Sequence, residues 1–129
     1  MTRAELVSRT RQLIAEGERL AMAPSLAGLR LWLHLSDDLL ATAWGSMDRY
    51  HLSWLQVGRP RAAVRGRPMS AAEEAAYVRE VAAAKTAVLR MSLDAAERRR
   101  MPFRGEDPPA AGGGGRAAGG GGPEVRAGG

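Results

Sequence analysis

The fold is decided by residues 29–58, which read LRLWLHLSDDLLATAWGSMDRYHLSWLQVG. This segment contains all three tryptophans, both histidines and one of the two tyrosines of the chain. Its apolar residues recur at the three- and four-residue spacing of amphipathic helices, and Gly45 interrupts the pattern. The segment therefore predicts two consecutive helices, at 26–44 and at 47–57.

The helix predicted at 26–44 is apolar over more than half of its surface, which is typical of the central helix of a bundle. Ser25 precedes it as a favourable N-cap. Ser36 lies inside its apolar arc, where its hydroxyl is expected to donate a hydrogen bond to the Trp32 carbonyl. Leu31 and Leu35 flank the arc, and a chain this small is expected to leave them uncovered for a partner.

The helix predicted at 47–57 begins after an N-cap at Ser46 and ends at Gly58. Together with helix 26–44 it could form a helix-turn-helix. As a DNA-reading helix it would expose only Arg49, Ser53 and Gln56, which are few donors for base recognition, so we disfavour this reading. Its buried stripe is expected to comprise Met47, Tyr50, Trp54 and Val57.

A first helix is predicted at 3–22, before this central segment. Thr2 and Glu5 have the spacing of a capping box, and Pro24 ends the helix. Gly17 lies on the apolar stripe of this helix. It marks either a close helix crossing or a soft spot that weakens the helix by about 1 kcal/mol relative to alanine.

A last helix is predicted to begin at Ser70, which forms a second capping box with Glu73. Ser92 and Asp94 could restart it as a separate piece ending near Met101, which leaves four or five helices. The expected fold is an all-α bundle. The buried seam of the last helix is expected to comprise Tyr77, Val81, Ala84, Val88, Met91 and Ala95.

Domain organisation follows from composition. Residues 1–104 are expected to form one helical domain, with an Arg- and Pro-rich connector at 58–69. Residues 105–129 contain two runs of four glycines and three prolines. Such a segment cannot bury enough apolar surface to offset its ordering entropy, so we expect a disordered tail.

The overall composition excludes several classes of protein. The chain has no cysteine, so disulfide scaffolds, thiolate metal sites and thiol nucleophiles are excluded. No apolar run reaches the roughly 18 residues of a membrane span, and residues 1–13 lack the apolar core of a signal peptide. We expect a cytoplasmic protein that contacts no membrane and uses no cofactor.

The formal net charge is +5, and the arginines are clustered. Gly-Arg-Pro occurs twice in the connector, and this tripeptide resembles the core of an AT-hook, whose arginines enter the narrow minor groove of DNA. The resemblance implies contact with nucleic acid, non-specific DNA or RNA included; the alternative is a solvated loop. The connector residues concerned are Arg59, Arg61, Arg65 and Arg67.

A second arginine cluster, Arg98, Arg99 and Arg100, follows the last helix. It either extends a nucleic-acid-binding surface or simply complements the helix dipole at a C-terminus.

Two pairs of histidine and aspartate suggest an alternative, metal-binding or hydrolytic function. His34 and Asp38 lie four residues apart on helix 26–44, and Asp48 and His51 lie three apart on the next helix. Such pairs on two helices could converge on a divalent metal. However, His34 lies about 140° from the apolar arc of its helix, so we favour an ion pair for His34 and a packing role for His51. The function predicted from the sequence is a helical interaction or accessory protein without catalytic machinery, bound to a protein partner or to itself.

Overall fold

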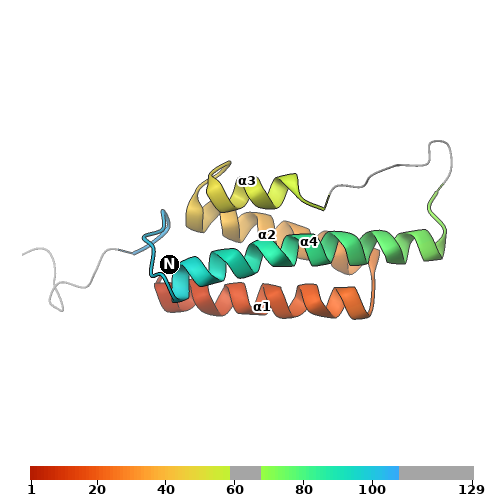
Figure 1. Ribbon diagram of the computed structural model, residues 1–129, viewed down its shortest axis with the longest axis horizontal. Helices are drawn as coiled ribbons and strands as arrows, with labels where there is room; N and C mark the ends of the chain where they lie inside the picture. Colours follow the sequence, from red (N-terminus) through yellow and green to blue (C-terminus); the bar gives the residue numbers. More distant parts are fainter. Residues whose placement is uncertain (59–67, 108–129) are drawn as a thin grey trace, which may run out of the picture.

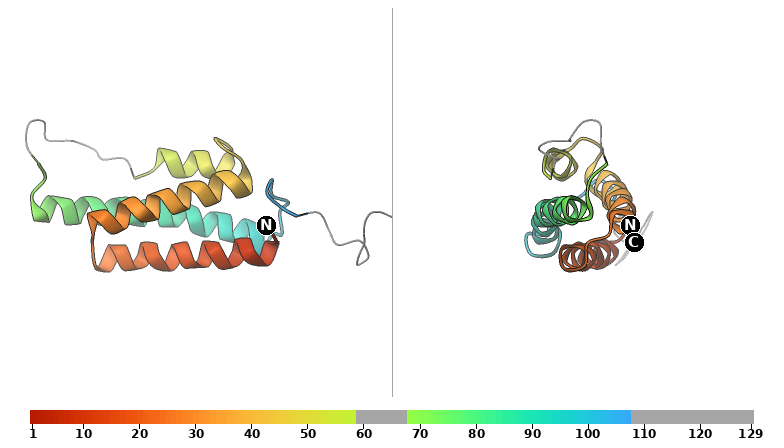
Figure 2. Two further views of the ribbon diagram at one scale, coloured as in Figure 1. Left: turned by 180° about the vertical axis from the view of Figure 1, so that it is seen from behind. Right: turned by 90° about the vertical axis from the view of Figure 1, so that its right-hand side faces the viewer.

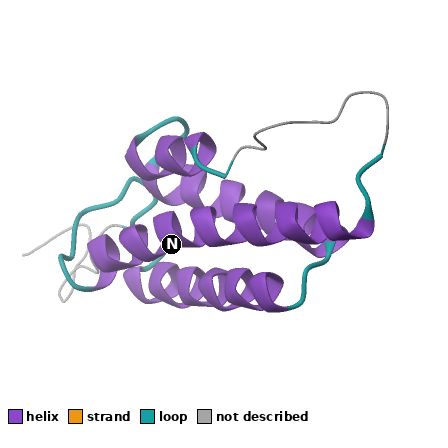
Figure 3. Cartoon of the chain, turned by 45° about the vertical axis from the view of Figure 1, so that its right-hand side comes forward, coloured by secondary structure: helices purple, strands orange, loops and turns teal. Residues whose placement is uncertain are grey.

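The computed structural model describes residues 1–58 and 68–107, and these residues form four helices and no strand (Figures 1 and 3). The predicted all-α fold is confirmed. The arginines of the connector and the predicted disorder of 108–129 lie outside the described residues. The helices are α1 (Arg3–Met22), α2 (Leu26–Trp44), α3 (Arg49–Gln56) and α4 (Ala71–Glu97).

Each helix runs antiparallel to the next, and the end-on view shows α1, α4, α3 and α2 arranged around a common core (Figure 2). The 20-residue α1 packs along the 27-residue α4. The eight-residue α3 covers α2 and α4 along only part of their lengths (Figure 1). Among the described residues, the side of α2 that carries Leu31 and Leu35 is left exposed by the other three helices.

Capping residues determine where α1, α2 and α4 begin. Both predicted capping boxes, Thr2 with Glu5 and Ser70 with Glu73, are present, and the Ser25 hydroxyl accepts the Gly28 N–H. Hydrogen bonds from the Thr2 backbone N–H and the Thr2 hydroxyl hold the pKa of the Glu5 carboxyl below its ordinary value. These caps satisfy backbone groups that a helix end leaves unpaired.

Three helices, α1, α2 and α4, cross closely within the core. The Trp32 indole N–H donates to the Leu13 carbonyl at 2.8 Å, which joins α2 to α1. A Cβ atom on Gly17 would lie 2.8 Å from the Trp32 ring and closer still to the Thr86 hydroxyl of α4. Gly17 therefore marks a close helix crossing, the first of its two predicted roles.

The start of α3 differs from the prediction. Asp48, rather than Ser46, is the N-cap, and α3 begins at Arg49. Met47, expected in the buried stripe, has a positive φ of 61° and is 59% exposed. Because Met47 belongs to the turn, its side chain is directed by the left-handed backbone and not by a helical period.

The length and the buried face of α4 also differ from the prediction. It continues without a break to Glu97, so the predicted restart at Ser92 is wrong within the described residues. Met91, predicted in the seam, is 57% exposed. The buried face is broader than a narrow seam because α4 packs against α1 on one side and α3 on another. It consists of Val78, Val81, Ala82, Lys85, Thr86, Val88, Leu89, Ser92, Ala95 and Ala96.

The predicted hydrogen bond of Ser36 is absent from the described residues. Its hydroxyl is fully buried without a partner there. Ser36 is the one polar residue among the buried residues of α2.

Residues 105–107, expected to belong to the disordered tail, pack against the helices. The Gly105 N–H donates to the Ala43 carbonyl at 3.0 Å, and the Asp107 N–H donates to the Met1 carbonyl at 3.0 Å. The Arg3 guanidinium pairs with Glu106 at 3.0 Å. The folded unit therefore extends three residues beyond the predicted boundary at 104.

These contacts predict different outcomes for two truncations. Removing 108–129 leaves every contact between residues 1–58 and 68–107 in place, so we expect the free energy of unfolding to stay unchanged. Removing 105–129 should lower it by about 1–2 kcal/mol. Two long-range backbone hydrogen bonds and two ion pairs, Met1 N-terminus–Asp107 and Arg3–Glu106, are lost. Urea denaturation followed by circular dichroism measures both. Equal stability of the two truncated chains would contradict this role of residues 105–107.

Candidate interaction surface

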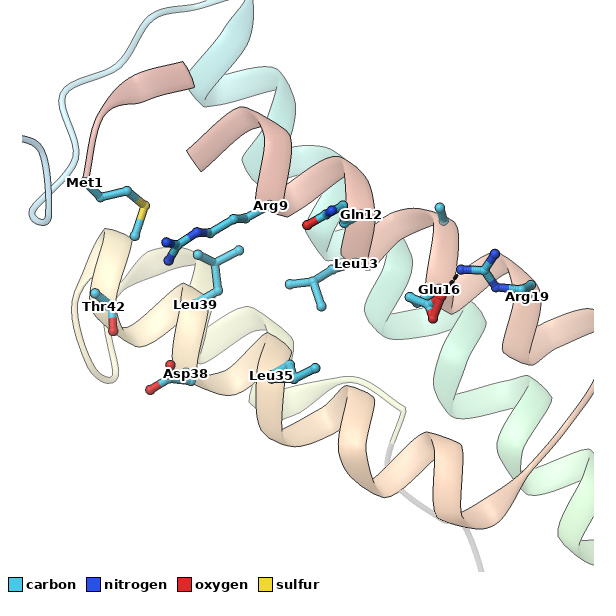
Figure 4. A pocket seen from close by; sticks show the side chains of 11 residues that line it. Met1, Arg9, Gln12, Leu13, Glu16, Arg19, Leu35, Asp38, Leu39 and Thr42 are labelled. Carbon is cyan, nitrogen blue, oxygen red and sulfur yellow. Dashed lines mark ion pairs between the residues drawn. The ribbon is translucent and has the colours of Figure 1, made fainter. Parts of the chain in front are cut away.

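An open groove of about 620 Å³ runs between α1 and α2 (Figure 4). Leu13 of α1 and Leu39 of α2 are buried beneath it, and Leu35 stands on its α2 wall. The α1 wall is polar and carries Arg9, Gln12, Glu16 and Arg19. The groove thus has an apolar floor and charged walls.

The outward face of α2 adjoins this groove. Leu31 is 61% exposed and Leu35 is 48% exposed, although both are leucines on the most apolar helix of the chain. They lie one helical turn apart, so their side chains form a continuous apolar strip. The prediction that these two residues remain uncovered is confirmed for the described residues.

The arrangement around α2 explains why the strip is uncovered. The side of α2 that carries Leu29, Trp32 and Leu40 is buried against the other helices. At 100° per residue, Leu31 lies about 100° from Trp32 and 160° from Leu29 on the helical wheel. The short α3 covers a different side of α2, where Asp37 pairs with a residue of α3.

Charges on the walls of the groove are only partly paired. Glu16 forms an ion pair with Arg19, shown in Figure 4, and Glu5 lies 3.9 Å from Arg9. Asp38, on the opposite wall, has no ion pair among residues 1–58 and 68–107. A partner that occupies the groove would therefore meet an uncompensated carboxylate.

The four residues of the predicted metal site serve different purposes. His34 and Asp38 are exposed on α2 and form no ion pair with each other within residues 1–58 and 68–107, so the predicted pair is wrong. The Asp48 carboxylate accepts the Arg49 N–H as the cap of α3. The described residues contain no group of three or more histidine, aspartate or glutamate side chains placed to hold a metal ion.

His51 is engaged through both ring nitrogens. Its Nε2 pairs with the Asp37 carboxylate, and its Nδ1 accepts the Met47 N–H at 2.8 Å. The ring also stacks on Trp54 at 6.4 Å between centroids. His51 therefore fastens the turn and α3 to α2, a packing role, and the sequence did not identify Asp37 as its partner.

Lys85, the only lysine of the chain, is a buried residue that the sequence reasoning missed. Its ammonium group donates to the Trp54 carbonyl and lies 4.0 Å from the centroid of the Trp54 ring. Its position seven residues after Val78 on the buried face of α4 was the available signal. Lys85 anchors α3 to α4 by satisfying a carbonyl near the end of α3.

The second arginine cluster is exposed at the C-terminal end of α4, where Arg98 pairs with Asp94 at 3.6 Å. The connector leaves Gly58 beside Val81, since a Cβ atom on Gly58 would lie 3.2 Å from the Val81 Cα, and it rejoins α4 at Ser70. At 1.5 Å per residue, these two attachment points lie about 25 and about 40 Å along α4 from Arg98. Joint binding of nucleic acid by the two clusters stays a prediction.

Comparison of the chain with protein-family models, with curated proteins and with solved structures found no match. No helix of the described residues is long and apolar enough to span a lipid bilayer.

Proposed function

We propose that this chain is a small helical interaction or accessory protein of the cytoplasm. It binds an amphipathic helix along the groove between α1 and α2, with the Leu31–Leu35 strip as the central contact. The observation that carries the proposal is the exposure of these two leucines beside a groove with a leucine floor. In helix-in-groove binding, an amphipathic helix lays its apolar face against such a groove.

The polarity of the groove favours a protein partner over a small molecule. Small-molecule sites place a few polar groups so that they converge inside an apolar pocket. Here the polar side chains that line the groove, including Arg9, Arg19 and Asp38, are exposed. An apolar centre with a charged rim is the usual anatomy of a protein interface.

Site-specific photo-crosslinking in cells that produce the chain tests the proposal. Leu35 is replaced by the photoreactive residue p-benzoylphenylalanine, and the adducts formed on irradiation are identified by mass spectrometry. We expect one or a few defined protein adducts, because a bound helix would hold its side chains against this position.

The matched control places the same photoreactive residue at Ala87, an exposed position on α4. Adducts that form at position 35 but not at position 87 support the proposal. Absence of adducts at position 35, or the same adducts at position 87, would overturn it.

A further inference from the structure

The outward face of α2 carries charges of opposite sign at its two ends. Arg30 and Asp38 lie eight residues apart, about 12 Å along the helix axis, and both are exposed. Neither forms an ion pair within the part of the chain that the structure describes. The exposed residues of this face are Ala27, Arg30, Leu31, His34, Leu35, Asp38 and Thr42.

This pattern is complementary to itself when a second copy is turned end to end. In an antiparallel pair of α2 helices with a two-fold axis at His34, Arg30 of each copy lies level with Asp38 of the other. The two-fold axis thus produces two identical Arg30–Asp38 pairs, as an isologous interface requires. A parallel pair would instead place like charges level with each other and repel.

The same register brings the exposed leucines together. With the axis at His34, Leu31 of one copy is offset from Leu35 of the other by two residues, or about 3 Å along the helix. Side chains of antiparallel helices interleave at such offsets when the helix axes are 8–10 Å apart. The same antiparallel register therefore pairs the charges and brings the apolar strips together.

We propose that the partner on this face is a second copy of the same chain, docked antiparallel through α2 with the two-fold axis at His34. This inference rests on the proposed function, because it names the occupant of the same surface. The dimer covers Leu31 and Leu35 of both copies and pairs each free Arg30 with an Asp38.

A charge exchange tests the register. Sedimentation equilibrium of the full chain between about 1 and about 200 µM gives the dimer dissociation constant. Arg30→Asp alone and Asp38→Arg alone should each weaken dimerisation at least about tenfold, since two attractive pairs become repulsive. The double variant, with the charges exchanged, should return to within about threefold of the original chain. Both positions are exposed, and circular dichroism verifies that each variant folds.

A disulfide provides a second measurement that does not depend on charge. The chain has no cysteine, so His34→Cys introduces a single thiol. Helix axes about 9 Å apart bring two Cα atoms beside the two-fold axis to about 6 Å, within disulfide range. Mild oxidation should link the His34→Cys chain into dimers, whereas Ala87→Cys, on the exposed surface of α4, should remain unlinked.

The outcomes separate this inference from the proposed function. A chain that stays monomeric, a dimer insensitive to both single exchanges, or a double variant that does not recover would overturn the antiparallel α2 dimer. If the monomeric chain still forms adducts with another protein at position 35, the proposed function stands and only the identity of the partner is wrong. If position 35 forms no adduct at all, both proposals fail.

Discussion

Replacing Trp32 by alanine is expected to lower the free energy of unfolding by about 4 kcal/mol. The side chain is 3% exposed, lies against the Gly17 backbone and donates to the Leu13 carbonyl. Its removal leaves a cavity where α1, α2 and α4 meet and also breaks a hydrogen bond. Since a domain of this size is stabilised by roughly 5–15 kcal/mol in total, the loss would bring it close to unfolding. Urea denaturation followed by far-ultraviolet circular dichroism measures the change.

Two further variants show which part of the Trp32 side chain matters. Trp32→Phe keeps much of the apolar volume but loses the hydrogen bond, so part of the cost, including about 1 kcal/mol for that bond, should remain. Met91→Ala removes a large apolar side chain that is 57% exposed, and its effect should stay within about 0.5 kcal/mol. A loss below about 1 kcal/mol for Trp32→Ala would show that the helix crossing does not depend on this ring.

Features set by neighbouring residues were predictable from the sequence. The bounds of α1 and α2 were predicted correctly because Thr2 and Ser25 cap them and Pro24 separates them. Ser70, the N-cap of α4, was likewise identified from its spacing to Glu73. A capping box involves residues only three apart, so its geometry follows from the local chain.

Features set by distant contacts could not be predicted. The pairing of His51 with Asp37 depends on how α3 folds back on α2, and the burial of Lys85 depends on a carbonyl of α3. The positive φ of Met47 belongs to the same turn. No spacing in the sequence specifies these contacts, because they join residues brought together only by the tertiary fold.

Only the α2 part of the candidate surface could be predicted from the sequence. Leu31 and Leu35 lie outside the apolar arc with which α2 packs against the other helices, and the helical period of the sequence shows this directly. The α1 wall of the groove, with Arg9 and Arg19, could not be predicted, because it depends on how far α1 and α2 diverge in the structure. For Asp38 the sequence predicted an ion pair with His34, and only the fold showed that neither Arg30 nor Asp38 forms an ion pair among the described residues.

Gly17→Ala is the second substitution with a large expected effect, and two opposing contributions decide its sign. Alanine favours a helix interior over glycine by about 1 kcal/mol. Against this, the new Cβ would lie 2.8 Å from the Trp32 ring, which its hydrogen bond to Leu13 holds in place, and closer to the Thr86 hydroxyl. Overpacking a rigid contact costs about 3 kcal/mol at the upper end of its usual range. We therefore expect a net loss of about 2 kcal/mol in urea denaturation.

Gly28→Ala is the matched control, because its Cβ would have looser contacts: Leu20 Cδ2 at 3.2 Å, Ser25 Oγ at 3.3 Å and Ser25 Cβ at 3.4 Å. Helix propensity should prevail there and leave stability unchanged or raised by up to about 1 kcal/mol. Adding Thr86→Ala to Gly17→Ala should recover part of the loss, since the Thr86 hydroxyl has no hydrogen-bond partner within the described residues. If Gly17→Ala were as stable as the original chain, α1 and α4 would have to separate at little cost. The close crossing would then be a consequence of glycine at this position and not a requirement of the fold.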